Sequence, residues 1–103
     1  MQYRTPVLIN RYKSKDFDVY IGRGTKWGNP FPIDEACGQT RLIVIEMYRH
    51  QMYEWLENGT ITVQDILDLS GKTIACSCAP KACHGDIIIE VFNEIVSMMN
   101  AGT

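Results

Sequence analysis

Three short segments of the chain show the apolar patterns of β-strands. Val7–Asn10 is a short apolar run, and Phe17–Ile21 alternates between apolar and polar positions and is rich in β-forming residues. Thr73–Cys78 is a third run of this kind, and Pro80 ends it. Short runs bounded by polar residues, glycine or proline are typical of strands, so we predict one strand in each segment.

Apolar positions at helical spacing follow the second of these segments. Thr40 can cap a long helix, and Asn58-Gly59 can end it. This helix should have an apolar stripe wide enough to face a sheet. The stripe is expected to contain Leu42, Ile45, Arg49, Met52, Tyr53 and Leu56, with Val44, Tyr48 and Trp55 beside it. Thr62–Asp65 resembles a capping box with Asp in the Glu position, which predicts a short second helix.

A final helix is predicted to begin near Cys83 or His84 and to continue through Met98. The predicted order is therefore β-β-α-α-β-α. A helical crossover between the second and third strands implies that these two strands are parallel. We expect an α/β fold, a small and mostly parallel sheet of about three strands with helices packed on it. We expect the 103 residues to form a single domain, residues 1–103.

Composition and charge narrow the classes of function. The formal net charge is −2 and the pI is about 5.6, which argues against an extended nucleic-acid footprint. No apolar run approaches the roughly 18 residues of a membrane span, and the N-terminus lacks the apolar core of a signal peptide. We expect a cytoplasmic, reducing environment, in which the four cysteines are thiols or metal ligands rather than disulfides.

The first candidate site is the loop Gly22–Phe31, which directly follows a predicted strand. Glycines permit a left-handed backbone or a close approach to a ligand, and such a turn exposes backbone N–H groups that can cradle an anion. The expected ligand-binding residues are the glycines, the two cations, an aromatic ring for stacking and an amide: Gly22, Gly24, Arg23, Lys26, Trp27 and Asn29. The alternative is a structural turn in which Trp27 and Phe31 belong to the core.

The second candidate site is the segment Cys76–Asp86. Alternation along a strand places Cys76 and Cys78 on one face, and the positive end of the following helix can lower a thiol pKa. Cys83 could then act as a nucleophile, with His84 as its base or acid and Asp86 as the orienting carboxylate.

Two alternatives stay open for this segment. Three sulfurs and one imidazole, from Cys76, Cys78, Cys83 and His84, suit a tetrahedral zinc ion, although the spacing C-x-C-x4-C-H is unusual. The cysteines could also be small buried apolar residues, with Asp86 favouring the helix start. We assign no metal or cofactor to this segment from the sequence. The four-ligand alternative implies zinc.

The runs VYIGRGTKWGNPF at Val19–Phe31 and CSCAPKACHGD at Cys76–Asp86 resemble domain of unknown function family 4326, which occurs in bacteria and their phages. The resemblance extends from Val7 to about Val96, and Arg41 and Tyr48 also look like helix residues of the family. Ser77 departs from the family, which commonly has an aromatic residue there, and this should alter packing rather than chemistry. The resemblance implies which positions matter but no activity.

Both motifs follow strands, and ligands of parallel α/β sheets bind at the carboxyl edge of the strands. By this fold-level analogy, we expect one pocket between the two motifs, with Arg41 entering from the helix start. The leading hypothesis is a small enzyme or binding domain for a nucleotide-like or other anionic metabolite. The alternatives are a non-catalytic module with a structural zinc and a phage protein that binds a host factor.

Overall fold

The computed structural model describes residues 2–77 and 82–101 of the chain. It confirms the α/β class and the predicted element order, and it adds one short 3-10 helix that the sequence pattern did not predict. The elements are β1 (Val7–Asn10), β2 (Val19–Tyr20), η1 (Glu35–Cys37), α1 (Arg41–Asn58), α2 (Val63–Leu67), β3 (Thr73–Cys76) and α3 (His84–Ala101).

The three strands form a parallel sheet with the order β1-β3-β2. Leu8 lies opposite Ile74, and Tyr20 lies opposite Ala75. The predicted parallel pairing of the second and third strands is therefore confirmed. Since all the strands run in one direction, their carboxyl ends meet at a single edge of the sheet, which is where ligands of such sheets bind.

The second strand is shorter than the expected Phe17–Ile21, although its hydrogen bonds to β3 continue on both sides. The Asp18 N–H donates to the Thr73 carbonyl at 2.9 Å, and the Ile21 N–H donates to the Ala75 carbonyl at 2.9 Å. The Asp18 carboxylate also accepts from the Thr73 N–H at 2.8 Å. These bonds fix Ile21, and hence the loop after it, against the central strand.

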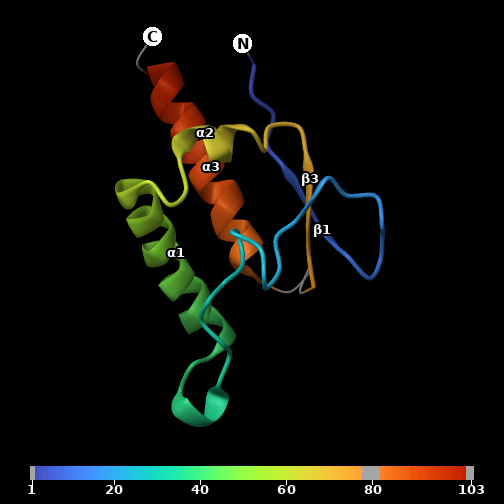
Figure 1. The fold of residues 1–103 in the computed structure, drawn as a ribbon, viewed down its shortest axis with the longest axis vertical. Coiled ribbons are helices and arrows are strands. Elements are labelled where there is room, and N and C mark those ends of the chain that lie inside the picture. The colour runs from blue at the N-terminus through green and yellow to red at the C-terminus, as the bar shows by residue number, and fades with distance from the viewer. Residues whose placement is uncertain (1, 78–81, 102–103) are drawn as a thin grey trace.

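The helices lie to one side of the sheet, with α3 between the sheet and α1 (Figure 1). This arrangement buries a continuous apolar core, and burial of apolar area is the main force that holds such a domain together. The largest fully buried side chains come from the loop after β2, from all three α-helices, from β3 and from the connection before α2: Ile21, Tyr48, Met52, Ile61, Ile66, Ile74, Ile88, Val91 and Phe92.

The predicted ends of α1 are confirmed, but its predicted buried stripe is partly wrong. Thr40 caps the helix and Gly59 ends it in the left-handed conformation, with φ 84°. The buried row is Val44, Tyr48 and Met52, because residues four apart lie on one helical face and this row faces α3. Two members of the expected stripe lie outside this row and are exposed, Leu42 by 72% and Tyr53 by 42%.

Polar contacts between α1 and α3 lie beside the buried row of α1. Arg49 pairs with Glu90, and the Tyr53 hydroxyl donates to Glu94.

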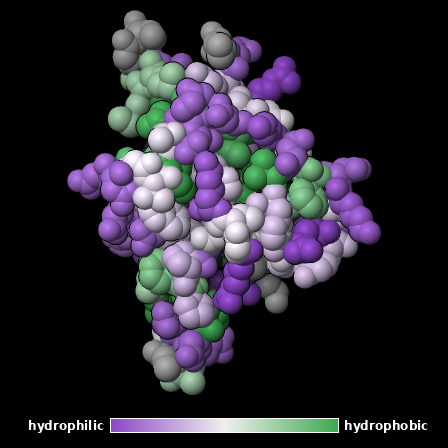
Figure 2. Space-filling model, in the orientation of Figure 1, coloured by the Kyte–Doolittle hydropathy of each residue, from purple (hydrophilic) through white to green (hydrophobic). Residues whose placement is uncertain are grey.

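Polar residues cover most of the face in Figure 2, and the apolar surface there is divided into small areas. Within residues 2–77 and 82–101, no helix is long and apolar enough to cross a membrane.

Candidate functional site

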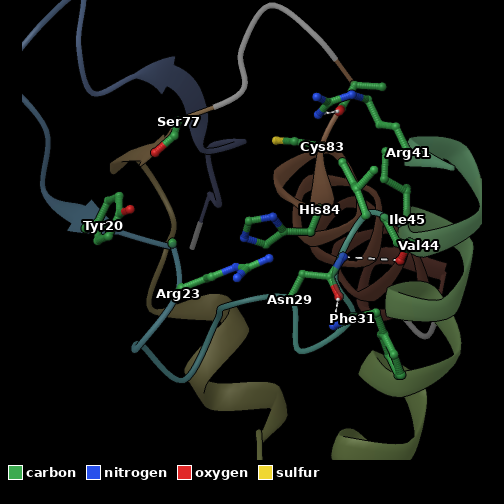
Figure 3. Close-up of a pocket in the computed structure, with 13 residues that line it drawn as sticks. Tyr20, Arg23, Asn29, Phe31, Arg41, Val44, Ile45, Ser77, Cys83 and His84 are labelled. Carbon is green, nitrogen blue, oxygen red and sulfur yellow. Dashed lines mark hydrogen bonds between the residues drawn. The ribbon is translucent and has the colours of Figure 1, made fainter. Parts of the chain in front are cut away.

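A cavity of about 270 Å³ opens at the carboxyl edge of the sheet. This volume is near the lower end of small-molecule sites. The ends of β2 and β3, the Gly22–Phe31 loop, and the starts of α1 and α3 contribute its walls (Figure 3). The structure thus brings both sequence motifs to one hollow, whose lining is Tyr20, Gly22, Arg23, Asn29, Phe31, Ile33, Arg41, Val44, Ile45, Ser77, Ala82, Cys83 and His84.

Two consecutive turns shape the loop that forms one wall. The Gly22 carbonyl accepts from the Thr25 hydroxyl at 2.7 Å, and the Gly28 N–H donates to the Thr25 carbonyl at 3.1 Å. A Cβ atom at Gly28 would lie 2.7 Å from the Gly22 carbonyl oxygen, so the close approach of these backbones requires glycine. Gly24 has φ +87° and does not line this cavity.

Arg23 and Arg41 give the cavity its positive charge. Arg23 is exposed and, among the residues that the structure describes, has no hydrogen bond or ion pair. Arg41 donates through Nη1 to the Ala82 carbonyl at 3.2 Å, which ties the start of α1 to the approach to α3. The described lining contains neither aspartate nor glutamate, so no carboxylate on this wall neutralises the two guanidinium groups.

Asn29 lines the cavity, but both ends of its amide serve the fold. Its Nδ2 donates to the Val44 carbonyl at 3.2 Å, and its Oδ1 accepts from the Phe31 N–H at 2.9 Å. These two bonds hold the loop against α1 and turn the chain through Pro30. The structure therefore gives Asn29 a positioning role at the cavity wall.

Trp27 and Lys26 are not brought to this cavity. Trp27 is 5% exposed and packs in the core, and its carbonyl accepts from the buried Tyr48 hydroxyl at 2.6 Å. Lys26 pairs with Asp65 at 3.1 Å. It lines a second, open hollow, which shares Arg23 and Asn29 with the first. An indole in this position contributes apolar burial rather than a surface for stacking.

His84 is a buried side chain at the start of α3, and it is 8% exposed. Its Nε2 lies 2.6 Å from the Ile21 carbonyl oxygen, and its ring packs on Tyr48 with centroids 5.0 Å apart. Burial lowers the pKa of His84, so the ring is neutral at neutral pH. Because a carbonyl only accepts, Nε2 carries the proton and Nδ1 has the lone pair.

We predict that His84 makes folding sensitive to pH. Its folded pKa lies below the unfolded value of about 6.5, so the unfolded chain binds the proton more tightly. Its contribution to stability is complete above pH 6.5 and is lost as the pH falls below that value, with a slope of at most about 1.4 kcal/mol per pH unit. Urea unfolding between pH 7.5 and 5 would measure this slope.

The chain offers a matched control, because its second histidine, His50, is exposed on α1. We expect His84→Gln to flatten the pH dependence of the unfolding free energy, and His50→Gln controls for the replacement of an exposed histidine. Equal slopes in the parent protein and the His84→Gln variant would contradict this assignment.

Cys83 is buried beside Cys76, with the two Sγ atoms 3.4 Å apart. The Cys83 sulfur also accepts from the Gly85 N–H at 3.3 Å. Burial raises the pKa of the Cys83 thiol to about 12, which differs from the lowered pKa expected of a nucleophile at a helix start. Removal of the sulfur from water outweighs the helix and the Gly85 hydrogen bond, because desolvation disfavours the thiolate.

Alkylation would test this property of Cys83. A thiol with a pKa about three units above its usual value has far less thiolate, so iodoacetamide should modify Cys83 at least about 100-fold more slowly in the folded protein than in urea. Peptide mass spectrometry at pH 8 gives the two rates. Comparable rates in the two states would contradict the burial of this thiol.

Two further predictions for this segment concern Asp86 and Cys78. Asp86 is exposed, and its Oδ2 accepts from the Cys83 N–H at 3.1 Å, so it caps the start of α3. Within the described part of the chain it has no hydrogen bond to His84, which is oriented by Ile21 and Tyr48 instead. Cys78, a member of the predicted zinc set, lies outside the described residues.

Sequence reasoning missed two hydroxyl groups at the cavity, Tyr20 and Ser77. A hydrogen bond with Ser77 lowers the pKa of Tyr20, and a hydrogen bond with Arg11 adds to the effect. The Arg11 guanidinium also lies over the Tyr20 ring, 4.6 Å from its centroid. Both hydroxyls stand at strand ends, and the signal that could have found them is their position at the carboxyl edge of the predicted sheet.

The fold and this cavity define a small parallel α/β domain with a cationic hollow at the strand ends. The chain belongs to the family described as Domain of unknown function (DUF4326), whose model matches residues 8–94, so the resemblance seen in the sequence is confirmed. It is 40% identical over 88 residues to an uncharacterized 12.4 kDa protein in the nrdA-td intergenic region of Enterobacteria phage T4. That alignment covers 85% of this chain and 78% of the phage protein. No solved structure gives a significant match.

Proposed function

We propose that the cavity binds a small anionic metabolite, such as a nucleotide-like phosphate ester. The observation that carries this proposal is the charge of the wall. Arg23 and Arg41 line one hollow that has no described carboxylate, although the chain as a whole has a net charge of −2. Guanidinium groups bind phosphate and carboxylate oxygens through paired N–H donors.

The start of α3 supports the same interpretation. Cys83 and His84 place the N-terminal turn of an 18-residue helix at the cavity. Such a turn carries a partial positive charge and favours an anion in front of it. The helix acts together with the two arginines. The Asp86 carboxylate, which accepts from the Cys83 N–H at this turn, offsets part of the positive charge of the turn, so the arginines contribute most of the attraction.

The wall next to α1 is apolar, which favours a ligand with an organic group beside its charge. Phe31, Val44 and Ile45 line the side of the cavity next to α1. A mostly apolar wall with a few placed polar groups is typical of small-molecule sites. A sugar or base attached to a phosphate would match these two surfaces.

Equilibrium binding would test the proposal. Uridine 5′-monophosphate and uridine differ only in the phosphate, so calorimetric titration of both at low salt isolates the contribution of the anion. We expect the monophosphate to bind at least about tenfold more tightly, which corresponds to about 1.4 kcal/mol. No binding of the monophosphate, or equal binding of the two compounds, would contradict the proposed function.

A further inference from the structure

The His84 ring is fixed in one orientation at the centre of the cavity wall. In Figure 3 it lies between Cys83 and Arg23. The Nε2–H donates to the Ile21 carbonyl at 2.6 Å, and the ring rests on Tyr48. A buried ring with this contact cannot turn without leaving the Ile21 carbonyl unpaired, which is costly away from water.

The other ring nitrogen, Nδ1, has no partner among the described residues, although the side chain is more than nine-tenths buried. No described side-chain nitrogen or oxygen is both fully enclosed and without a partner, so Nδ1 is open to the cavity that His84 lines. In the neutral ring this nitrogen is a hydrogen-bond acceptor.

The polar atoms around it differ in character. Arg23 and Arg41 present only donors, and both Asn29 groups are already engaged with the backbone. A ligand made only of acceptor oxygens would satisfy the arginines but leave Nδ1 unpaired. A bound ligand that excludes water from Nδ1 must therefore bring a donor of its own, because an unpaired buried acceptor is unfavourable.

We propose that the ligand is a hydroxylated phosphate ester, and that Nδ1 of His84 accepts a hydrogen bond from its hydroxyl group while the arginines hold its phosphate. The inference rests on the proposed anion site and narrows its ligand class. His84 is then a specificity-determining residue, and it selects phosphate esters of polyols or sugars over simple alkyl phosphates.

Glycerol 3-phosphate and propyl phosphate are matched probes, since they share the phosphate and the three-carbon chain and differ in the hydroxyl groups. We expect the parent protein to bind glycerol 3-phosphate at least about tenfold more tightly. Equal binding would overturn this inference and leave the anion site standing, whereas binding of neither would overturn both.

His84→Leu removes the ring nitrogen and leaves no side-chain acceptor, whereas His84→Gln has an amide oxygen that can accept in place of Nδ1. We expect the ratio of the affinities for glycerol 3-phosphate and propyl phosphate to fall to about one in His84→Leu and to stay nearer the parent value in His84→Gln. A ratio in His84→Leu equal to that of the parent protein would overturn the role of Nδ1. Long-range ¹H–¹⁵N NMR of the parent protein decides the matter even if the variants do not fold. The signal of His84 should show an unprotonated Nδ1 that shifts with glycerol 3-phosphate but not with propyl phosphate, while His50 serves as the internal reference.

Discussion

Replacement of Trp27 by alanine should lower the free energy of unfolding by about 3–5 kcal/mol, which is the usual cost of removing a large aromatic side chain from a core. Trp27 is 5% exposed and packs with the core residues. For a domain of this size, whose total stability is typically about 5–15 kcal/mol, such a loss is severe. Urea unfolding monitored by circular dichroism would measure it.

Two controls separate a core role from a role in binding. Trp27→Phe keeps an aromatic ring in the core and should cost less, and Lys26→Ala removes a neighbour that is half exposed and should cost little. Binding of uridine 5′-monophosphate per folded molecule should be unchanged in Trp27→Phe, because Trp27 does not line the cavity. A small loss of stability combined with a large loss of binding would favour ligand stacking instead.

The second large effect is expected at Arg23. Replacement of Arg23 by glutamine should weaken the binding of a phosphate ester by about 10–100-fold, because a hydrogen bond to a charged group contributes about 1.5–3 kcal/mol. The guanidinium has no ion-pair partner in the described part of the chain, so its removal should leave folding nearly unchanged. Calorimetric titration of the two proteins with uridine 5′-monophosphate gives the ratio of dissociation constants.

Arg23→Lys and Lys72→Gln complete this comparison. Lysine keeps the charge but not the paired donors, so Arg23→Lys should bind with an affinity between those of the parent protein and Arg23→Gln. Lys72 immediately precedes β3 and therefore lies at the opposite edge of the sheet from the cavity. Its replacement by glutamine removes the same charge and should change binding little. Equal losses in Lys72→Gln and Arg23→Gln would indicate a general charge effect rather than a site.

Local sequence signals were sufficient to predict most of the fold. Thr40, Gly59 and the Thr62–Asp65 capping box mark helix ends through bonds within a few residues, and the structure has them as expected. The α1 stripe failed at Leu42 and Tyr53 because several faces of that helix carry apolar residues. Only the packing of α3 decides which of these faces is buried.

In the candidate site, too, some features follow from neighbouring residues and others from residues far away in the sequence. The position of both motifs after parallel strands was enough to predict that the Gly22–Phe31 loop and Cys83-His84 lie together. The burial of Trp27 and the contact of His84 with the Ile21 carbonyl depend on residues far away in the sequence. The burial that raises the Cys83 pKa likewise comes from the tertiary fold, so the helix start alone suggested the wrong direction.

The central claim is that an anion binds in the cavity between Arg23, Arg41 and the start of α3. Two-dimensional ¹H–¹⁵N NMR during a titration with inorganic phosphate tests it most directly, with sodium chloride at matched ionic strength as the control. The largest shifts are predicted at the backbone amide of His84 and the side-chain Nε–H groups of Arg23 and Arg41. An unchanged spectrum, or shifts confined to Lys26, Thr60 and other residues that line only the second hollow, would contradict the claim.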